Sequence, residues 1–375
     1  MEDLFDYLRW RGDLTFSQVP PNAVDALIFS ALSYLSFGGA MESQPDVPVT
    51  LRDASEEFFR MEDAQDRCRL KIDLSLLMAA SETVRFGETG LVHYRSILIP
   101  EEDTQFAAIS YLLDNGEIFI TFRGTDYSLT GWKEDFNMSF QESIPAQRLA
   151  VAYTQEIGET FSGNLYLGGH SKGGNLAVFA GVKSPESIRS RILAIYNQDG
   201  PGFTDFVMRD PVYPQMVPKI HTIIPQSSVI GMLLEHEEPY TVVKSKQIGL
   251  LQHDPYSWVL RGPEFVTMEE ITNDSRFLDM TIKNWLAEMN TQERNEIVDT
   301  VFDLLTIENA SSVFDLIHPK HIRSYLKALS TDGKTRRRLT EEILSLIEAA
   351  RKTQMELEGF QSEAQEPVDN GETTE

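Results

Sequence analysis

Residues 164–177 read Asn-Leu-Tyr-Leu-Gly-Gly-His-Ser-Lys-Gly-Gly-Asn-Leu-Ala. A short apolar run ends in glycines, turns, and restarts as an Ala-rich segment with helical propensity. Gly169 to Gly173 fits the pattern Gly-x-Ser-x-Gly, a strand-to-helix turn that holds a serine hydroxyl above a sheet. Side chains two residues before or after Ser171 would collide with the neighbouring strand and helix, which explains the glycines. The stretch therefore makes Ser171 a candidate nucleophile, and an ordinary glycine turn is the alternative interpretation.

Length and composition indicate a globular protein. The chain has 375 residues, which is enough for two domains or for one large domain with an appendage. Its first residues are acidic and lack the pattern of a signal peptide, and no apolar run approaches the roughly 18 residues of a membrane span. The single cysteine, Cys68, excludes an internal disulfide and suits a reducing compartment. We expect a cytoplasmic protein without a transmembrane segment.

The charge of the chain limits its partners. The net charge of −25 repels phosphate backbones and anionic lipid surfaces, so nucleic-acid binding is not expected. A local basic cluster at Lys334 and Arg336–Arg338 is better explained as a solvated entrance to a helix. Metal-ligand spacings and nucleotide-binding loops are not visible in the sequence, so we expect neither a metal nor a cofactor.

The first two thirds of the chain alternate between strand and helix patterns. Expected helices are 22–37, which reads as amphipathic with Asn22 as its cap, 52–86 and 146–157; expected strands are 106–113, 117–122, 191–196, 219–225, 241–245 and the run before Ser171. Asn115-Gly116 between the first two strands is a hairpin signal. This alternation predicts an α/β fold, with a mostly parallel sheet covered by helices on both faces.

From about residue 264 the pattern is helical only. Apolar stripes at helical spacing run through 277–289, 297–305 and 343–350, with breaks near 290–291, 318–319 and 332–333. We expect these stripes to face a core or a docking surface. Residues 361–375 carry five acids and no base, which predicts a disordered acidic tail.

Two motifs in this order carry a family resemblance. They are Phe122-Arg123-Gly124-Thr125 with Trp132 seven residues further on, and then Gly169-His170-Ser171-Lys172-Gly173-Gly174. Together they resemble the class 3 (fungal-type) lipases and, within that group, an uncharacterised bacterial lipase-like family of α/β hydrolases. Two further stretches, 199–203 and 252–255, are similar to later motifs of the group. The resemblance covers roughly residues 20 to 260 and leaves the helical part outside.

The resemblance implies a domain division and a set of roles. Residues 1–262 would form an α/β-hydrolase-like domain with a lid or cap at about 126–145, followed by a helical region, 263–360, and the tail. Ser171 would be the nucleophile, and the peptide N–H groups of Thr125 and Lys172 would form the oxyanion hole. Trp132 falls where such lipases carry a lid, although a buried structural tryptophan fits equally well. His170, which recurs in class 3 lipases, is interpreted as a packing residue under the turn.

The catalytic base in this fold is a histidine that follows the serine in the chain. The histidines that satisfy this order are His221, His236, His253, His318 and His321. We favour His253, because it lies in a loop beyond the last expected strand, and His236 is the nearest rival.

The acid is where the chain departs from the class 3 pattern. Those lipases place an aspartate after the strand that ends here at Pro225, but this chain has Gln226-Ser227-Ser228. Asp199, after the preceding strand, is the natural substitute, with Glu235 and Asp254 as rivals. The acid orients the imidazole and stabilises its cation.

These observations leave two hypotheses of function. The first is a cytoplasmic serine hydrolase of the lipase/esterase type, which cleaves a carboxylic ester of a lipid or a small molecule through an acyl-enzyme. The second is a catalytically weak or inactive hydrolase-fold protein whose C-terminal helices bind a protein partner. The side chain of Lys172 either binds a carboxylate or phosphate of the substrate or forms a surface ion pair, and we favour the ion pair.

Overall fold

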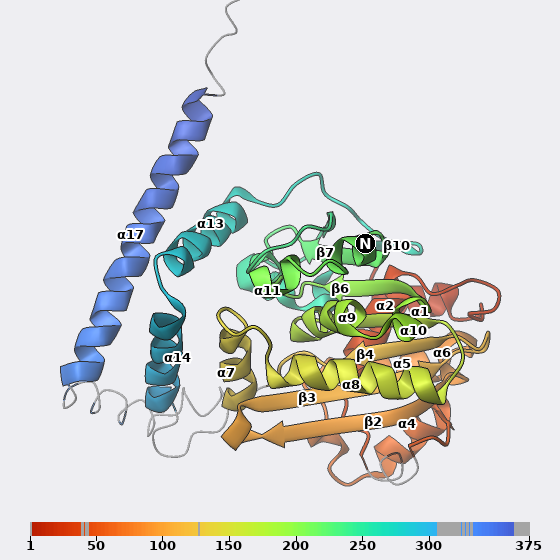
Figure 1. The fold of residues 1–375 in the computed structure, drawn as a ribbon. Helices are drawn as coiled ribbons and strands as arrows, with labels where there is room; N and C mark the ends of the chain where they lie inside the picture. Colours follow the sequence, from red (N-terminus) through yellow and green to blue (C-terminus); the bar gives the residue numbers. More distant parts are fainter. Residues whose placement is uncertain are drawn as a thin grey trace, which may run out of the picture.

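The central feature of the fold is an eight-stranded sheet whose strands follow their chain order (Figure 1). A computed structural model describes residues 2–38, 41, 45–126, 128–305, 324, 327, 330 and 333–363. The strands are β1 (Val49–Thr50), β2 (Gly90–Ile99), β3 (Thr104–Leu112), β4 (Ile118–Phe122), β5 (Leu165–His170), β6 (Ile192–Gln198), β7 (Ile220–Pro225) and β8 (Tyr240–Val243). Pairs from β1 to β4 are antiparallel, and the four pairs from β4 to β8 are parallel. The predicted mostly parallel α/β fold is confirmed.

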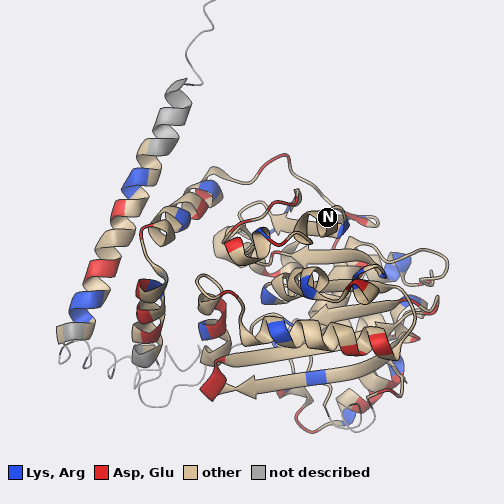
Figure 2. Ribbon diagram, viewed as in Figure 1, with Lys and Arg blue, Asp and Glu red and all other residues tan. Residues whose placement is uncertain are grey.

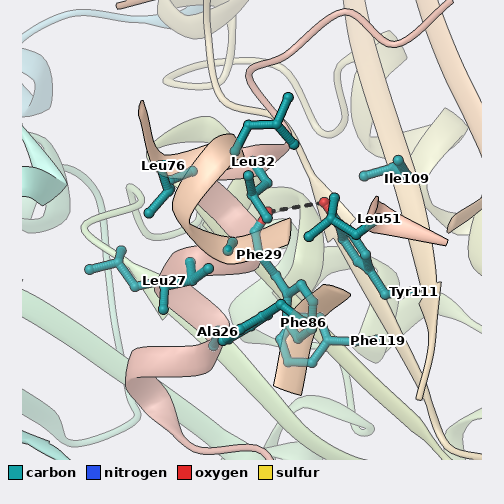
Figure 3. Close-up of a cluster of buried hydrophobic side chains, with 14 of the residues drawn as sticks. Ala26, Leu27, Phe29, Leu32, Leu51, Leu76, Phe86, Ile109, Tyr111 and Phe119 are labelled. Atoms are coloured by element: carbon teal, nitrogen blue, oxygen red, sulfur yellow. Dashed lines mark hydrogen bonds between the residues drawn. The ribbon is translucent and has the colours of Figure 1, made fainter. Parts of the chain in front are cut away.

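Helices cover both faces of the sheet, because alternate residues of its strands point to opposite sides. In β4, Ile118 and Ile120 join a core with helices α8 (Pro145–Thr160) and α9 (Lys172–Lys183). Phe119, between them, joins a second core on the other face, which includes residues of α2 (Ala23–Leu32). Figure 3 shows part of this second core. The ring centroid of Phe29 lies 4.4 Å from that of Tyr111, 4.9 Å from that of Phe119 and 5.2 Å from that of Phe86. The two cores hold the centre of the sheet rigid on both sides.

The remaining elements are short or lie at the rim. The other helices of the first two thirds are α1 (Leu4–Arg11), α4 (Leu51–Arg60), α5 (Lys71–Ser81), α6 (Val84–Gly87), α7 (Leu129–Asn137), α10 (Glu186–Arg189), α11 (Asp205–Met208) and α12 (Tyr213–Met216). The 3-10 helices are η1 (Ala64–Asp66), η2 (Pro100–Glu102), η3 (Val217–Lys219), η4 (Ile230–Met232), η5 (Gly249–His253) and η6 (Pro255–Ser257). A two-stranded sheet pairs β9 (Leu260–Arg261) with β10 (Glu264–Phe265).

Three local expectations differ from the structure. Asn22 caps α2 as predicted, but the helix ends at Leu32, and its residues from Val24 to Leu32 are all buried rather than amphipathic. The expected helix 52–86 is divided into α4, α5 and α6. Strand β2 was not predicted, because His93 adopts a positive φ of 54° at a break in register that interrupts the alternation.

The C-terminal part is helical, as expected. Its helices are α13 (Asn273–Ala287), α14 (Thr291–Leu305) and α17 (Gly333–Glu363). The predicted break at 290–291 is confirmed. Helix α17 begins at Gly333, but residue 332, the predicted break at 318–319 and the tail from 364 lie outside the described residues. Whether the chain divides into separate units at 262/263 stays a prediction.

The apolar stripes of α14 and α17 have different surroundings. Val298 and Phe302 of α14 are buried against Leu129 of α7. Ile343 and Leu344 of α17, in contrast, are exposed. Figure 2 shows charges of both signs along α14 and α17, whereas the strands of the sheet are mostly uncharged. None of the helices in the described ranges is long and apolar enough to cross a membrane.

Candidate active site

Ser171 lies on the predicted sharp turn between β5 and α9. Its φ is +59°, which is unusual for a residue with a side chain, and its N–H donates to the carbonyl of Gln198 at 2.9 Å. A Cβ on Gly169 would collide with the backbone of Gly173, and one on Gly173 would collide with the carbonyl of Phe122. The two glycines are therefore required for the close approach of β4, β5 and α9 at this point.

Asp199 and His253 are brought together beside this turn. Asp199 follows β6, the strand next to β5, and its buried carboxylate oxygen Oδ2 lies 2.6 Å from Nδ1 of His253. Since a carboxylate only accepts, Nδ1 of His253 carries the proton, which leaves Nε2 as a proton acceptor. The His253 side chain remains 25% exposed, whereas Asp199 is fully buried. This pair has the tautomer that a general base for a serine needs.

His170 connects the turn to the loop of His253. The two rings lie 4.5 Å apart, and Nε2 of His170 donates to the carbonyl of His253 at 2.8 Å. Its Nδ1 therefore accepts the hydroxyl proton of Tyr34 at 3.0 Å. Burial lowers the pKa of His170 well below its usual range, so this ring stays neutral. His170 is a buried packing residue next to Ser171 and positions the backbone of His253.

The rival acids have other contacts. The carboxylate of Asp254 accepts the N–H of Tyr256 at 3.1 Å and caps η6. Glu235 lies 3.9 Å from the ammonium of Lys283 on α13. Asp199 is the carboxylate that contacts His253 in the described part of the chain.

The rival bases are placed elsewhere. His221 is exposed on β7, and its ring stacks on that of Tyr196 at 5.2 Å. His236 forms a second histidine–carboxylate pair, with Nδ1 3.0 Å from Oε1 of Glu238. His318 and His321 lie outside the described residues.

The carboxylate of Glu238 connects His236 to two further side chains. It also accepts hydroxyl protons from Tyr213 at 2.5 Å and Thr222 at 2.7 Å. Burial raises the pKa of Glu238, but the bonds from His236, Thr222 and Tyr213 outweigh it and lower that pKa to about 2. Glu238 is therefore bonded to three side chains, of which Tyr213 and Thr222 are buried and His236 is half-buried.

The residues proposed for the oxyanion hole lie on the other side of β5. Thr125 follows β4, and Lys172 is the first residue of α9, where peptide N–H groups lack acceptors within the helix. The hydroxyl of Thr125 donates to Asp135 of α7. Burial raises the pKa of Asp135 to about 6, against the opposing charge of Lys172. The positive end of α9 and the loop after β4 thus face the same region beside Ser171.

The side chain of Lys172 forms a buried ion pair rather than the expected surface pair. Its Nζ lies 2.9 Å from Oε2 of Glu134, and both side chains are completely inaccessible to solvent. The same Nζ donates to the carbonyl of Gln105 at 2.9 Å and to its Oε1 at 2.7 Å. The ammonium therefore uses its three donors inside the protein, which argues against a role in binding a substrate anion.

This ion pair anchors α7, the helix in the expected lid segment. Glu134 additionally accepts the N–H groups of Gln105 at 3.1 Å and Ala146 at 2.9 Å. Trp132, on the outer side of the same helix, is 44% exposed, so it is not a buried structural tryptophan. Buried contacts of Glu134 thus connect α7 to β3 and α8.

Sequence reasoning missed several residues that hold this site together. Tyr34 and Ser228 are distant from the motifs along the chain, and Glu134, two residues after Trp132, meets Lys172 only through folding. The one signal for Ser228 was its place in the loop where class 3 lipases carry their acid. In the described part of the chain, no group of three or more His, Cys, Asp or Glu side chains is arranged so that it could hold a metal ion.

Comparisons with solved structures give low similarities to lipases. An M37 lipase structure has 14% identity over 57% of this chain and 70% of its own, with a TM-score of 0.36. The Rhizomucor miehei lipase propeptide complex has 14% identity over 66% of this chain and 82% of its own, with a TM-score of 0.33. A deletion mutant of that complex has 17% identity over 65% and 80%, with a TM-score of 0.35. No curated protein matches the sequence.

These likenesses are low, so the roles considered below rest on contacts within this chain. The Mbeg1-like family profile, in contrast, matches residues 80–303, which is more than half of the sequence and extends through α13. The chain belongs to the Mbeg1-like family.

Proposed function

We propose that this protein is a serine hydrolase that cleaves a carboxylic ester through an acyl-enzyme on Ser171. The observation that carries the proposal is the 2.6 Å contact between His253 Nδ1 and the buried Asp199, next to the turn that presents Ser171. A partly exposed imidazole, oriented by a buried carboxylate, is the arrangement that activates a serine.

The proposed reaction has two halves. Nε2 of His253 takes the proton of the Ser171 hydroxyl as its oxygen attacks the ester carbonyl, and the same proton then goes to the departing alcohol. Water then attacks the acyl-serine and gives a proton to His253, which passes it to the Ser171 oxygen as the bond to the acyl carbon breaks and the carboxylic acid leaves. Asp199 keeps its charge throughout and stabilises the imidazolium. The peptide N–H groups of Thr125 and Lys172 stabilise the negative oxygen that develops in each half.

The surface around His253 supports an apolar substrate. Three large side chains precede this histidine in the loop and η5, and all are strongly exposed: Ile248 at 79%, Leu250 at 65% and Leu251 at 63%. Exposed aliphatic groups next to a reactive histidine provide a contact surface for an acyl chain. We therefore favour an ester with a long acyl chain, such as a lipid, over a short polar ester.

A fluorophosphonate probe tests the proposed nucleophile. The probe should label the wild-type protein, and Ser171→Ala should abolish labelling. Ser227→Ala is a matched control that removes a nearby serine hydroxyl without contact to Asp199. Equal labelling of the wild type and Ser171→Ala would contradict the proposal.

A panel of esters with increasing acyl length tests the substrate class. The double variant Leu250→Ser/Leu251→Ser should raise KM for long-chain esters about tenfold, since roughly 1.5 kcal/mol of apolar contact is removed, and leave short-chain esters unchanged. A uniform effect on all chain lengths would indicate that these leucines do not contact the acyl group.

The alternative function is a binding module without turnover. The exposed apolar side chains of α17, Ile343, Leu344 and Met355, favour a contact of this helix with another protein. This reading expects no labelling by the probe and no turnover of any ester in the panel, so the same experiments separate the two functions.

A further inference from the structure

The loop after β7, residues 226–228, lies directly behind the proposed catalytic acid. The hydroxyl of Ser228 is 2.5 Å from Oδ1 of Asp199, the carboxylate oxygen that does not contact His253. The N–H of Gly231 donates to the Ser228 hydroxyl oxygen at 3.0 Å and to the same Oδ1 at 3.2 Å. Ser228 is only 1% exposed, so water does not compete for these bonds.

The direction of the bond from Ser228 follows from its partners. A serine hydroxyl has one proton, and the oxygen of Ser228 already accepts the N–H of Gly231. Its proton must therefore point at Asp199, because a carboxylate at neutral pH can only accept. A Cβ at position 231 would collide with Oδ1 of Asp199, so glycine is what allows this N–H to approach.

Helix α13 holds this loop from the other side. The hydroxyl of Ser275 donates to the carbonyl of Ser228, and the side chain of Ser275 is buried. The N–H of Thr272, the cap of α13, donates to the carbonyl of Gln226 at 2.7 Å, and its hydroxyl lies 3.0 Å from that of Ser227. The start of α13 is thus bonded to each residue of the loop.

The same loop also reaches the segment of the base. The N–H of Ser227 donates to the side-chain oxygen of Gln252 at 2.8 Å, and Gln252 directly precedes His253. Acid and base are therefore fixed against one loop, and that loop is fixed against α13.

We propose that Ser228 is a positioning residue for the catalytic acid Asp199, and that α13 acts on the acid through Ser275 and Ser228. This inference rests on the proposed function, since it assigns a partner to the acid of the Ser171 reaction. Asp199 needs such a partner because its backbone has a φ of +53°, a strained conformation that must be held by its surroundings. With Ser228 and Gly231 on Oδ1, rotation of the carboxylate away from His253 breaks two hydrogen bonds.

The test uses the full chain and three single variants. Ser228→Ala should lower kcat about 10- to 100-fold with KM unchanged, as expected for loss of a hydrogen bond to a charged group that does not touch the substrate. Ser275→Ala should lower kcat by roughly a factor of three, because the loop keeps its other bonds to α13. Ser227→Ala removes the hydroxyl contact with Thr272 of α13 but no contact with Asp199, so it should lower kcat by no more than the factor of three expected for Ser275→Ala.

A double-mutant cycle and a spectroscopic readout separate positioning from general destabilisation. The effect of Ser275→Ala on kcat should largely disappear in the Ser228→Ala background, because both act along one path. The far-downfield proton resonance of His253 Nδ1–H should move in Ser228→Ala and stay in place in Ser227→Ala, at temperatures where both are folded.

Equal kcat and equal resonance positions in Ser228→Ala and Ser227→Ala would overturn the inference. Failure of the proposed function has a different signature, namely a wild type without turnover or probe labelling. In that case a shifted resonance in Ser228→Ala still supports the hold of Ser228 on Asp199, and an unmoved resonance overturns it.

Discussion

The two sides of Ser171 are built from different kinds of interaction. After β6, Asp199 is held by uncharged donors and meets a histidine that is partly exposed to solvent. After β4, the wall carrying Thr125 is fixed by Lys172 and Glu134, which form an ion pair without access to water. In the proposed reaction His253, on the first side, exchanges a proton, whereas the side chains of the second side only stay in place. The histidine that would gain and lose a proton is thus partly open to solvent, whereas the charged pair that only fixes the backbone is fully buried.

The largest expected effect tests the Asp199 side. Asp199→Asn should lower kcat about 10⁴-fold, because an amide facing His253 Nδ1 favours the wrong imidazole tautomer. Glu235→Gln removes a rival acid that is exposed and paired with Lys283, so it should leave kcat within about twofold. Steady-state ester hydrolysis measures both. A larger loss in Glu235→Gln than in Asp199→Asn would reverse the assignment of the acid.

The next effect tests the Lys172 side through stability. Lys172→Met leaves Glu134 charged and buried without its partner, which should lower the free energy of unfolding by about 3–5 kcal/mol. The double variant Lys172→Met/Glu134→Gln should lose distinctly less, because no unpaired charge remains inside the protein. Denaturant unfolding measures both variants. A single variant as stable as the wild type would show that the pair does not anchor α7.

The smallest effect concerns Asp135, which accepts the hydroxyl of Thr125. Its pKa is raised from 3.8 to about 6, so its neutral form is favoured by folding and its contribution is fully present below pH 3.8. That contribution is lost as the pH rises through about 6. Asp135→Asn keeps the oxygen that accepts from Thr125 and removes the titration. It should be more stable than the wild type at pH 8 by roughly 1 kcal/mol, a figure reduced for the 31% exposure of the side chain.

Unfolding curves at pH 4 and pH 8 check the sign of this effect. The advantage of Asp135→Asn should appear at pH 8 and vanish at pH 4, where the wild-type carboxyl is also neutral. An advantage of equal size at both values would assign it to packing rather than to the charge of Asp135.

The contacts of α13 bear on how the molecule is divided. A boundary at 262/263 follows the change in sequence pattern, but the N-terminus of α13 is bonded to the loop that holds Asp199. The family match also runs through this helix, to residue 303. Deleting the C-terminal helices would thus also remove contacts that hold the loop behind the proposed acid. If a protein partner is lost after such a deletion, the position of Asp199 must be checked separately.

Local patterns in the sequence were sufficient for several parts of the fold. The glycines around Ser171, the Asn115-Gly116 hairpin and the cap at Asn22 each act on neighbouring residues, and each was found where it was predicted. Patterns that depend on distant partners were not readable. The sequence does not indicate strand β2, because its alternation breaks at His93. The residue pattern of α2 indicates an amphipathic helix, although its residues from Val24 to Leu32 are all buried.

The sequence by itself determined the turn that presents Ser171, because this turn follows from steric demands within a few residues. Only the tertiary structure decided which carboxylate meets His253 and that Lys172 is buried. Asp199, His253 and Ser228 are far apart in the chain, and they meet because parallel strands place successive loops at one edge of the sheet. The distance between these residues along the chain does not predict their contact, which depends on how the strands are ordered and aligned in the sheet.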